Sequence, residues 1–151
     1  MKKVLFLGIT MLMLVLTACN KESEQNIVGS WKLVLIQESN ESNDYDWDFS
    51  NESESYALED DYYYDFQKDG VVTFYDKDGN DGSCKWVYVD GKIIIDETTY
   101  NIENFSHKEM DLVISNYDEY YDEDEDYTYW YRDTYRMHFK RKKTPKEYRN
   151  K

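Results

Sequence analysis

Residues 62–96 read YYYDFQKDGVVTFYDKDGNDGSCKWVYVDGKIIID, and this stretch decides the fold class. Aromatic and apolar residues alternate in it with polar ones, which is the period of a strand with one buried face. Asp69-Gly70, the segment 76–82 and Asp90-Gly91 interrupt the alternation, and an Asp-Gly dipeptide favours a tight β-hairpin. The stretch therefore predicts consecutive antiparallel strands joined by short turns.

Four more segments have strand character, and helical spacing is not sustained beyond the N-terminal segment. They are 27–37 (IVGSWKLVLIQ), 99–105 (TYNIENF), 108–115 (KEMDLVIS) and 127–141 (YTYWYRDTYRMHFKR), the last with a bulge expected near Asp133. About eight strands at short intervals predict an all-β, antiparallel up-and-down meander, closed as a barrel or curled as a sandwich.

Acidic segments flank this pattern, and the chain carries a formal net charge of −14. Residues 38–60 and 117–126 are rich in Asp, Glu, Ser and Asn, so we expect a long loop or insertion and a hairpin tip. Residues 143–151 form a basic polar tail. Such a charge argues against nucleic acid as a partner, whereas the aromatic content of 17% argues against disorder for most of the chain.

The N-terminal segment has the character of a secretion signal. Two lysines precede an apolar run from Val4 to Leu16, which is shorter than the roughly 20 residues that span a bilayer. Residues 16–19 (LTAC) resemble the lipobox of bacterial lipoproteins. This resemblance implies a signal peptide over 1–18, cleavage before Cys19 and acyl chains such as palmitate on Cys19; the alternative is an ordinary signal peptide with a chance cysteine.

Residues 19–26 are then expected to be the lipidated cysteine and a polar tether. No Asp follows Cys19 directly, and Lys21 followed by acids resembles the surface-export signal of Bacteroides-group lipoproteins. We therefore expect a lipid-anchored protein of the cell envelope, in the outer membrane and facing outward, with the membrane as a partner through Cys19.

Four motifs, in order, resemble the lipocalin-like domain of small Bacteroides-group lipoproteins. They are IVGSWKLV with its Gly-x-Trp opening, FQKDGVVTFY, KWVYVDGKIIID and the closing YRMHFKRK, and they cover residues 27–142. The resemblance implies an eight-stranded lipocalin-like barrel in which Trp31 plugs the closed end under a stacked basic residue. Arg141 is the first candidate for that residue and Arg136 the second.

The aromatic residues of the strands allow two interpretations. They could line a ligand cavity, or they could fill a barrel whose interior is just wide enough for side chains. The candidates for cavity lining are Tyr62, Tyr64, Phe66, Phe74, Trp86, Tyr88, Tyr129 and Tyr131, with Tyr100 and Tyr135 beside them. Exposed rings among acids, as in residues 44–48, could instead form a recognition surface.

Catalytic chemistry has little support in the sequence. His107 is expected in a turn and His138 on an outward strand face, and neither accompanies a nucleophile motif. We therefore predict no catalytic residue, no cofactor and no enzymatic activity. Asp76, Asp78 and Asn80 are weak calcium candidates, because Asp81 stands where a calcium loop of the EF-hand type needs glycine; residues 118–126 are the other candidate.

Cys84 has no partner for a disulfide if Cys19 is lipidated, so we expect a small buried side chain on a strand. The leading hypothesis is a lipid-anchored, non-enzymatic, lipocalin-like envelope protein that binds a small hydrophobic molecule or an envelope protein. The alternative is a structural or accessory surface lipoprotein with a filled barrel that acts through its acidic, aromatic loops.

Overall fold

The computed structural model describes residues 23–44 and 52–151. Eight antiparallel strands, each hydrogen-bonded to the next in sequence, close into a barrel through pairing of the first with the last. They are β1 (Gly29–Ser42), β2 (Glu52–Phe66), β3 (Val71–Asp76), β4 (Gly79–Val89), β5 (Lys92–Ile95), β6 (Thr98–Glu103), β7 (Glu109–Asp122) and β8 (Tyr127–Arg141). Two short helices, α2 (Glu24–Ile27) and α3 (Lys146–Arg149), flank them. The predicted fold class, an all-β up-and-down barrel consistent with a lipocalin-like barrel, is confirmed.

The hairpin turns follow from the local sequence. Asp90 and Gly91 both have positive φ, 49° and 80°, as a two-residue type I′ turn requires. At the β2–β3 hairpin the Gln67 amide donates to the Val71 carbonyl at 2.8 Å, and Gly70 supplies a φ of 80°. Aspartate and glycine tolerate this left-handed region better than other residues, so these turns set the strand register.

The barrel is packed at the end where β1 begins. Trp31 has no exposed surface, and its indole N–H donates to the Ile27 carbonyl at 2.7 Å. The buried apolar cluster around it consists of Ile27, Leu33, Ile36, Phe66, Val72, Trp86, Ile93, Ile95, Ile102, Met110, Leu112, Met137 and Phe139. Side chains from all eight strands take part, so this closed end is filled by side chains.

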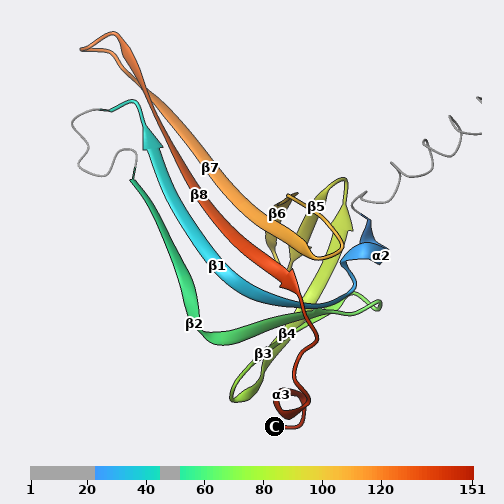
Figure 1. The fold of residues 1–151 in the computed structure, drawn as a ribbon. Helices are drawn as coiled ribbons and strands as arrows, with labels where there is room; N and C mark the ends of the chain where they lie inside the picture. Colours follow the sequence, from blue (N-terminus) through green and yellow to red (C-terminus); the bar gives the residue numbers. More distant parts are fainter. Residues whose placement is uncertain (1–22, 45–51) are drawn as a thin grey trace, which may run out of the picture.

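The strands differ greatly in length, and the difference gives the molecule its shape. β1, β2, β7 and β8 have 14 or 15 residues, whereas β5 has 4 and β6 has 6. Figure 1 shows the four long strands running together beyond the short ones toward the upper left. We call this projection the arm and define it as residues 37–44, 52–56 and 116–133; its sheet order is β2-β1-β8-β7.

The arm corrects one prediction and bears out another. Residues 38–60 are not a loop: β1 continues to Ser42 and β2 begins at Glu52, with 45–51 outside the described residues. The reason is cross-strand pairing, which overrides the low strand propensity of Asp, Ser and Asn. Residues 117–126 do form a hairpin tip, since β7 ends at Asp122 and β8 begins at Tyr127.

Three smaller expectations also change. The first strand begins at Gly29 and not at Ile27, because the expected tether ends in helix α2. Where β8 pairs with β1 the register shift lies in β1 between Leu33 and Leu35, and β8 pairs continuously with β7, so the bulge predicted near Asp133 is wrong. β4 begins at Gly79, which shortens the turn expected over 76–82.

The basic tail packs against the barrel. Arg149 Nη2 lies 2.8 Å from Asp65 Oδ2, and the ring of Tyr148 meets the ring of Tyr63 edge-on at 5.9 Å. Thr144 is buried. Helix α3 therefore covers part of the barrel wall near β3 and β4, far from the arm (Figure 1).

Candidate functional site

The four strands of the arm extend beyond the barrel. We call the face of the arm that continues the barrel interior its inward face. Met137 is buried in the core, and alternation along β8 places Tyr135, Asp133 and Tyr131 on the same side of the sheet. Pairing aligns residues of the other three strands with them. The inward face of the arm consists of Glu38, Asn40, Glu52, Glu54, Tyr56, Asn116, Asp118, Tyr120, Asp122, Tyr127, Tyr129, Tyr131 and Asp133.

Two surface pockets lie side by side on this inward face. The larger has a volume of about 330 Å³ and is lined by Glu38, Asn40, Ile114, Asn116, Asp133, Thr134 and Tyr135. The smaller, of about 220 Å³, is lined by Glu38, Asn40, Glu52 and Glu54. Because Glu38 and Asn40 belong to both, the pockets form one shallow trough across the four strands.

The trough brings like charges together. Glu38 and Glu54 are directly opposite each other in the β1–β2 register, an arrangement that destabilises an antiparallel pair. The Tyr56 hydroxyl donates to Glu38 Oε1 at 2.8 Å. This hydrogen bond to a carboxylate, with some burial and the nearby charge, raises the pKa of Tyr56 to about 12.

Aromatic rings cover the inward face toward the tip of the arm. Tyr120 stacks on Tyr129 with ring centroids 5.0 Å apart and on Tyr131 at 6.0 Å. Tyr127 meets Tyr129 edge-on at 5.0 Å. The rings remain accessible, since Tyr120 and Tyr127 are each 44% exposed. Exposed rings of this kind are typical of interface anchors.

The opposite, outward face carries a second aromatic group. Tyr117 stacks on Trp130 at 6.3 Å, and the Arg132 guanidinium lies about 6 Å from both rings. Tyr121, also on this face, is 57% exposed and donates to Asp126 at 2.5 Å. Arg132 is the only Lys or Arg in the arm, and it already lies 3.4 Å from Glu41.

The residues predicted to line a cavity separate into two groups. Phe66 and Trp86 are buried, and Tyr62, Tyr64, Phe74 and Tyr88 are half-buried and pack against the same core. Tyr64 stacks on Phe66, and Phe66 meets Trp86 edge-on at 5.1 Å. Tyr129 and Tyr131 lie on the arm, apart from the rest. The structure therefore brings six of the eight predicted residues together at the core.

Tyr64 shows how the half-buried rings fill space. Its ring meets Phe74 at 4.8 Å and Phe139 at 4.9 Å, and its hydroxyl lies 3.9 Å from Met137 Sδ. Burial raises its pKa, and the neighbouring phenols of Tyr100 and Tyr135 raise it further. Phenols from β2, β6 and β8 are thus close enough to raise one another's pKa.

Cys84 contributes to the same region. It is half-buried, packs against the core, and has no disulfide partner among the described residues. Burial raises the pKa of its thiol, which disfavours the reactive thiolate.

Trp31 and Arg141 lie together at the closed end. The Arg141 guanidinium lies 4.1 Å from the centroid of the Trp31 ring. It also donates to the carbonyls of Val28, at 3.1 Å, and Asn26. The other candidate, Arg136, points to a different cluster on the barrel wall.

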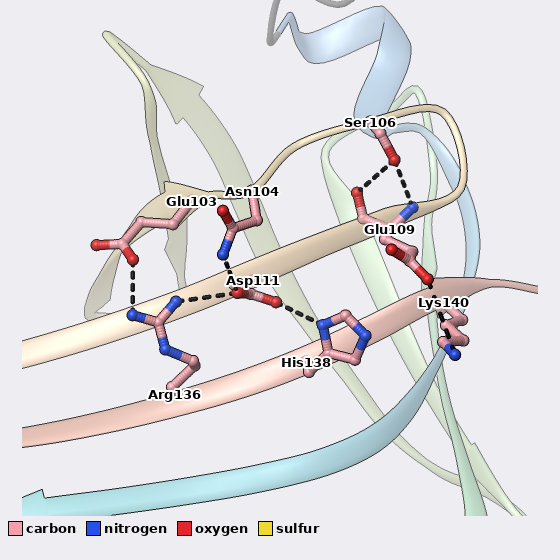
Figure 2. Close-up of polar contacts among 8 residues, drawn as sticks. All are labelled: Glu103, Asn104, Ser106, Glu109, Asp111, Arg136, His138 and Lys140. Carbon is pink, nitrogen blue, oxygen red and sulfur yellow. Dashed lines mark hydrogen bonds and ion pairs between the residues drawn. The ribbon is translucent and has the colours of Figure 1, made fainter.

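That cluster surrounds the carboxylate of Asp111, as Figure 2 shows. Asp111 is 4% exposed; it accepts hydrogen bonds from Asn104 Nδ2 at 2.7 Å and Arg136 Nη1 at 2.9 Å, and lies 2.6 Å from His138 Nδ1. Arg136 also bonds to Glu103 at 2.7 Å. Although burial alone would raise the pKa of Asp111, these donors together lower it. The cluster ties β6, β7 and β8 together on the outer wall.

The remaining metal and catalytic candidates serve turns. Asp76 Oδ1 accepts from the amides of Asp78 at 2.7 Å and Gly79 at 3.1 Å, and Asn80 Oδ1 accepts from Gly82 at 2.8 Å. His107 is exposed in the β6–β7 connection. Over residues 23–44 and 52–151, no group of three or more His, Cys, Asp or Glu residues is placed to hold a metal ion.

No protein-family model, no curated protein and no solved structure matches this chain. In the part of the chain that the structure describes, no helix has the length and apolar character to cross a membrane. Residues 1–22, with the expected signal peptide and Cys19, lie outside the described residues. The trough and the aromatic rings of the arm are therefore the candidate functional site on geometry alone.

Proposed function

We propose that this protein is a lipid-anchored, lipocalin-like envelope protein, attached through Cys19, whose barrel presents the arm to a cationic partner. It acts by binding and not by catalysis. The main observation behind this proposal is that exposed aromatic rings and carboxylates lie on both faces of the arm, where Arg132 is the only cationic side chain.

The chemistry of the arm suits a partner rich in Lys or Arg. Carboxylates attract ammonium and guanidinium groups, and aromatic faces bind the same cations. The acids of the trough spread across β1, β2 and β8 and do not converge to hold a metal ion. An extended cationic chain matches that spacing better than a single ion does.

The position of the N-terminal end of the described chain supports an outward-projecting arm. Helix α2 packs at the closed end, since Trp31 and Arg141 donate to its Ile27 and Asn26 carbonyls. Figure 1 shows α2 at the barrel body and the arm extending away from it. A lipid on Cys19, a few residues before α2, would hold the barrel at the membrane and leave the arm free.

Fluorescence polarisation with a labelled lysine-rich peptide tests the proposal on the full mature protein. We expect binding that weakens as salt is raised, because the attraction is electrostatic. A peptide with every Lys replaced by Glu is the matched control. If the two peptides bind equally, or neither binds, the arm is not a cation-binding surface.

A small molecule at the mouth of the barrel is the second candidate. The observation that favours it is that Tyr64, Tyr100 and Tyr135, which influence one another's pKa, are half-buried and all pack against the apolar core. Native mass spectrometry of protein purified from its own host would detect a co-purifying ligand. A Tyr100→Phe variant that retains the ligand undiminished would count against this position.

A further inference from the structure

The arm has a free edge along β7. On one side β7 pairs with β8 from Glu109 to Asp122. On the other side β6 pairs with β7 only from Asp111 to Val113. Among residues 23–44 and 52–151, no strand pairs with the outer edge of β7 from Ile114 to Asp122. A free edge presents unpaired backbone N–H and C=O groups to a further strand.

We propose that residues 115–122 of β7 take an extended, cationic segment of a partner as an additional strand of the arm sheet. This inference rests on the proposed function and states how the cationic partner is held. Main-chain hydrogen bonds along the edge would provide affinity, and side chains that alternate between the two faces would provide specificity.

The sequence of this edge lacks three of the features that commonly block strand addition. Natural edge strands are often blunted by proline, by lysine or by a bulge. Residues 114–122 (ISNYDEYYD) contain no proline, glycine or lysine, and their pairing with β8 is continuous. The edge is regular over its whole length and geometrically ready to pair.

The charge of the edge selects its occupant. Asp118 and Asp122 lie on the inward face, and Glu119 lies on the outward face. A second copy paired edge to edge would place carboxylates against carboxylates, which is destabilising. A segment with Lys or Arg on both faces would instead place cations beside these acids and beside the rings of Tyr117 and Tyr120.

The other free edge of the arm is a poorer site. On β2, residues 52–57 pair with β1 but not with β3, whose pairing begins at Tyr63. The part of this edge that pairs regularly with β1 is shorter than the β7 edge and carries serine at positions 53 and 55. Tyr117, Tyr120 and Tyr121 give the β7 edge the aromatic side chains that the β2 edge largely lacks.

Two N-methylated peptides separate edge pairing from binding on a face. Both have the lysine-rich sequence used above and carry four N-methyl groups, which remove backbone donors without changing charge. In one peptide the methyl groups are on alternate residues, so they block a single edge of the extended chain. In the other they are on consecutive residues and block both edges.

We expect the peptide with one blocked edge to bind the full mature protein like the unmodified peptide. The peptide with both edges blocked should bind at least tenfold more weakly. In hydrogen exchange, the unmodified peptide should protect amides of residues 115–122 and leave residues 52–57 unchanged.

Equal binding of the two methylated peptides, or protection absent from residues 115–122, would overturn the edge inference while leaving cation binding by the arm intact. No binding of even the unmodified peptide would overturn both the inference and the proposed function.

Discussion

Asp111 and His138 are directly opposite each other across β7 and β8, with the Asp111 carboxylate 2.6 Å from His138 Nδ1. Both residues are on the outer wall of the barrel, yet Asp111 is almost fully buried. Arg136 and Asn104 complete its shell. A buried carboxylate with several donors is costly to disturb, so this cluster should contribute to the stability of the barrel.

Asp111→Asn should lower the free energy of unfolding by about 3 kcal/mol, because it leaves Arg136 without its buried partner. The pH dependence should change as well. The folded-state pKa of Asp111 is lowered, so its contribution is present above the ordinary value of 3.8 and is lost as pH falls through the folded-state pKa.

Urea denaturation at pH 7 and at a series of values below 4 checks both effects. The wild-type protein should lose stability more steeply than Asp111→Asn over the acid range. Glu97→Gln, in the exposed β5–β6 turn, is the control and should behave like wild type. Parallel acid profiles for wild type and Asp111→Asn would contradict the account.

Arg141→Met should destabilise the barrel by about 1–2 kcal/mol. The substitution keeps much of the apolar stem but removes the cation over Trp31 and the donors to Val28 and Asn26. Chemical denaturation followed by far-ultraviolet circular dichroism measures the loss. Lys140→Met, one position earlier and only loosely paired with Glu109 at 3.8 Å, should have little effect. Equal losses in the two variants would show that the contact of Arg141 with Trp31 does not contribute to the free energy of unfolding.

Glu38→Gln should lower the pKa of Tyr56 from about 12 toward its ordinary value of 10. Removal of the carboxylate weakens the hydrogen bond that holds the phenol proton and removes the charge that opposes the phenolate. Carbon-13 NMR titration of labelled tyrosine measures this directly. Glu41→Gln, on the outward face of the same strand, is the control. An unchanged Tyr56 titration would contradict the geometry of the trough.

The barrel should fold without most of the arm. Asn116 and Asp133 are directly opposite in the β7–β8 register, so an Asn-Gly turn can join them in place of residues 117–132. We expect cooperative unfolding with a loss of about 2 kcal/mol or less, because most of the residues removed are exposed and the rest are aromatic pairs outside the core. Thermal unfolding followed by near-ultraviolet circular dichroism checks this. A loss of cooperative unfolding would show that the arm is part of the barrel core.

The barrel could be predicted from the sequence because its determinants are local. Alternation in residues 62–96 marks the buried face, and Asp-Gly pairs mark the turns. The arm could not be predicted in this way, because its strands are exposed on both faces. Their sequences therefore lack the alternation of apolar and polar residues that marks a strand with one buried face. Glu52 to Tyr56 becomes strand only by pairing with β1, which is a tertiary effect.

The site was less predictable. The prediction of a recognition surface was made for residues 44–48, of which 45–48 lie outside the described residues, and only the register shows that Tyr120 and Tyr129 meet on one face. Nothing in the sequence indicated the Asp111 cluster, since Asn104 reaches Asp111 from the β6–β7 connection and Arg136 reaches it from β8. The resemblance to lipocalin-like domains suggested a basic residue over Trp31, and the closing register of β1 with β8 places Arg141 there.

The central claim is that the arm binds a cationic partner. The most direct measurement compares the affinity of the lysine-rich peptide for the wild-type protein and for the shortened chain in which Asn-Gly replaces residues 117–132. We predict salt-sensitive binding by the wild type and at least a tenfold loss in the shortened, still folded chain. Undiminished binding by the shortened chain would contradict the claim.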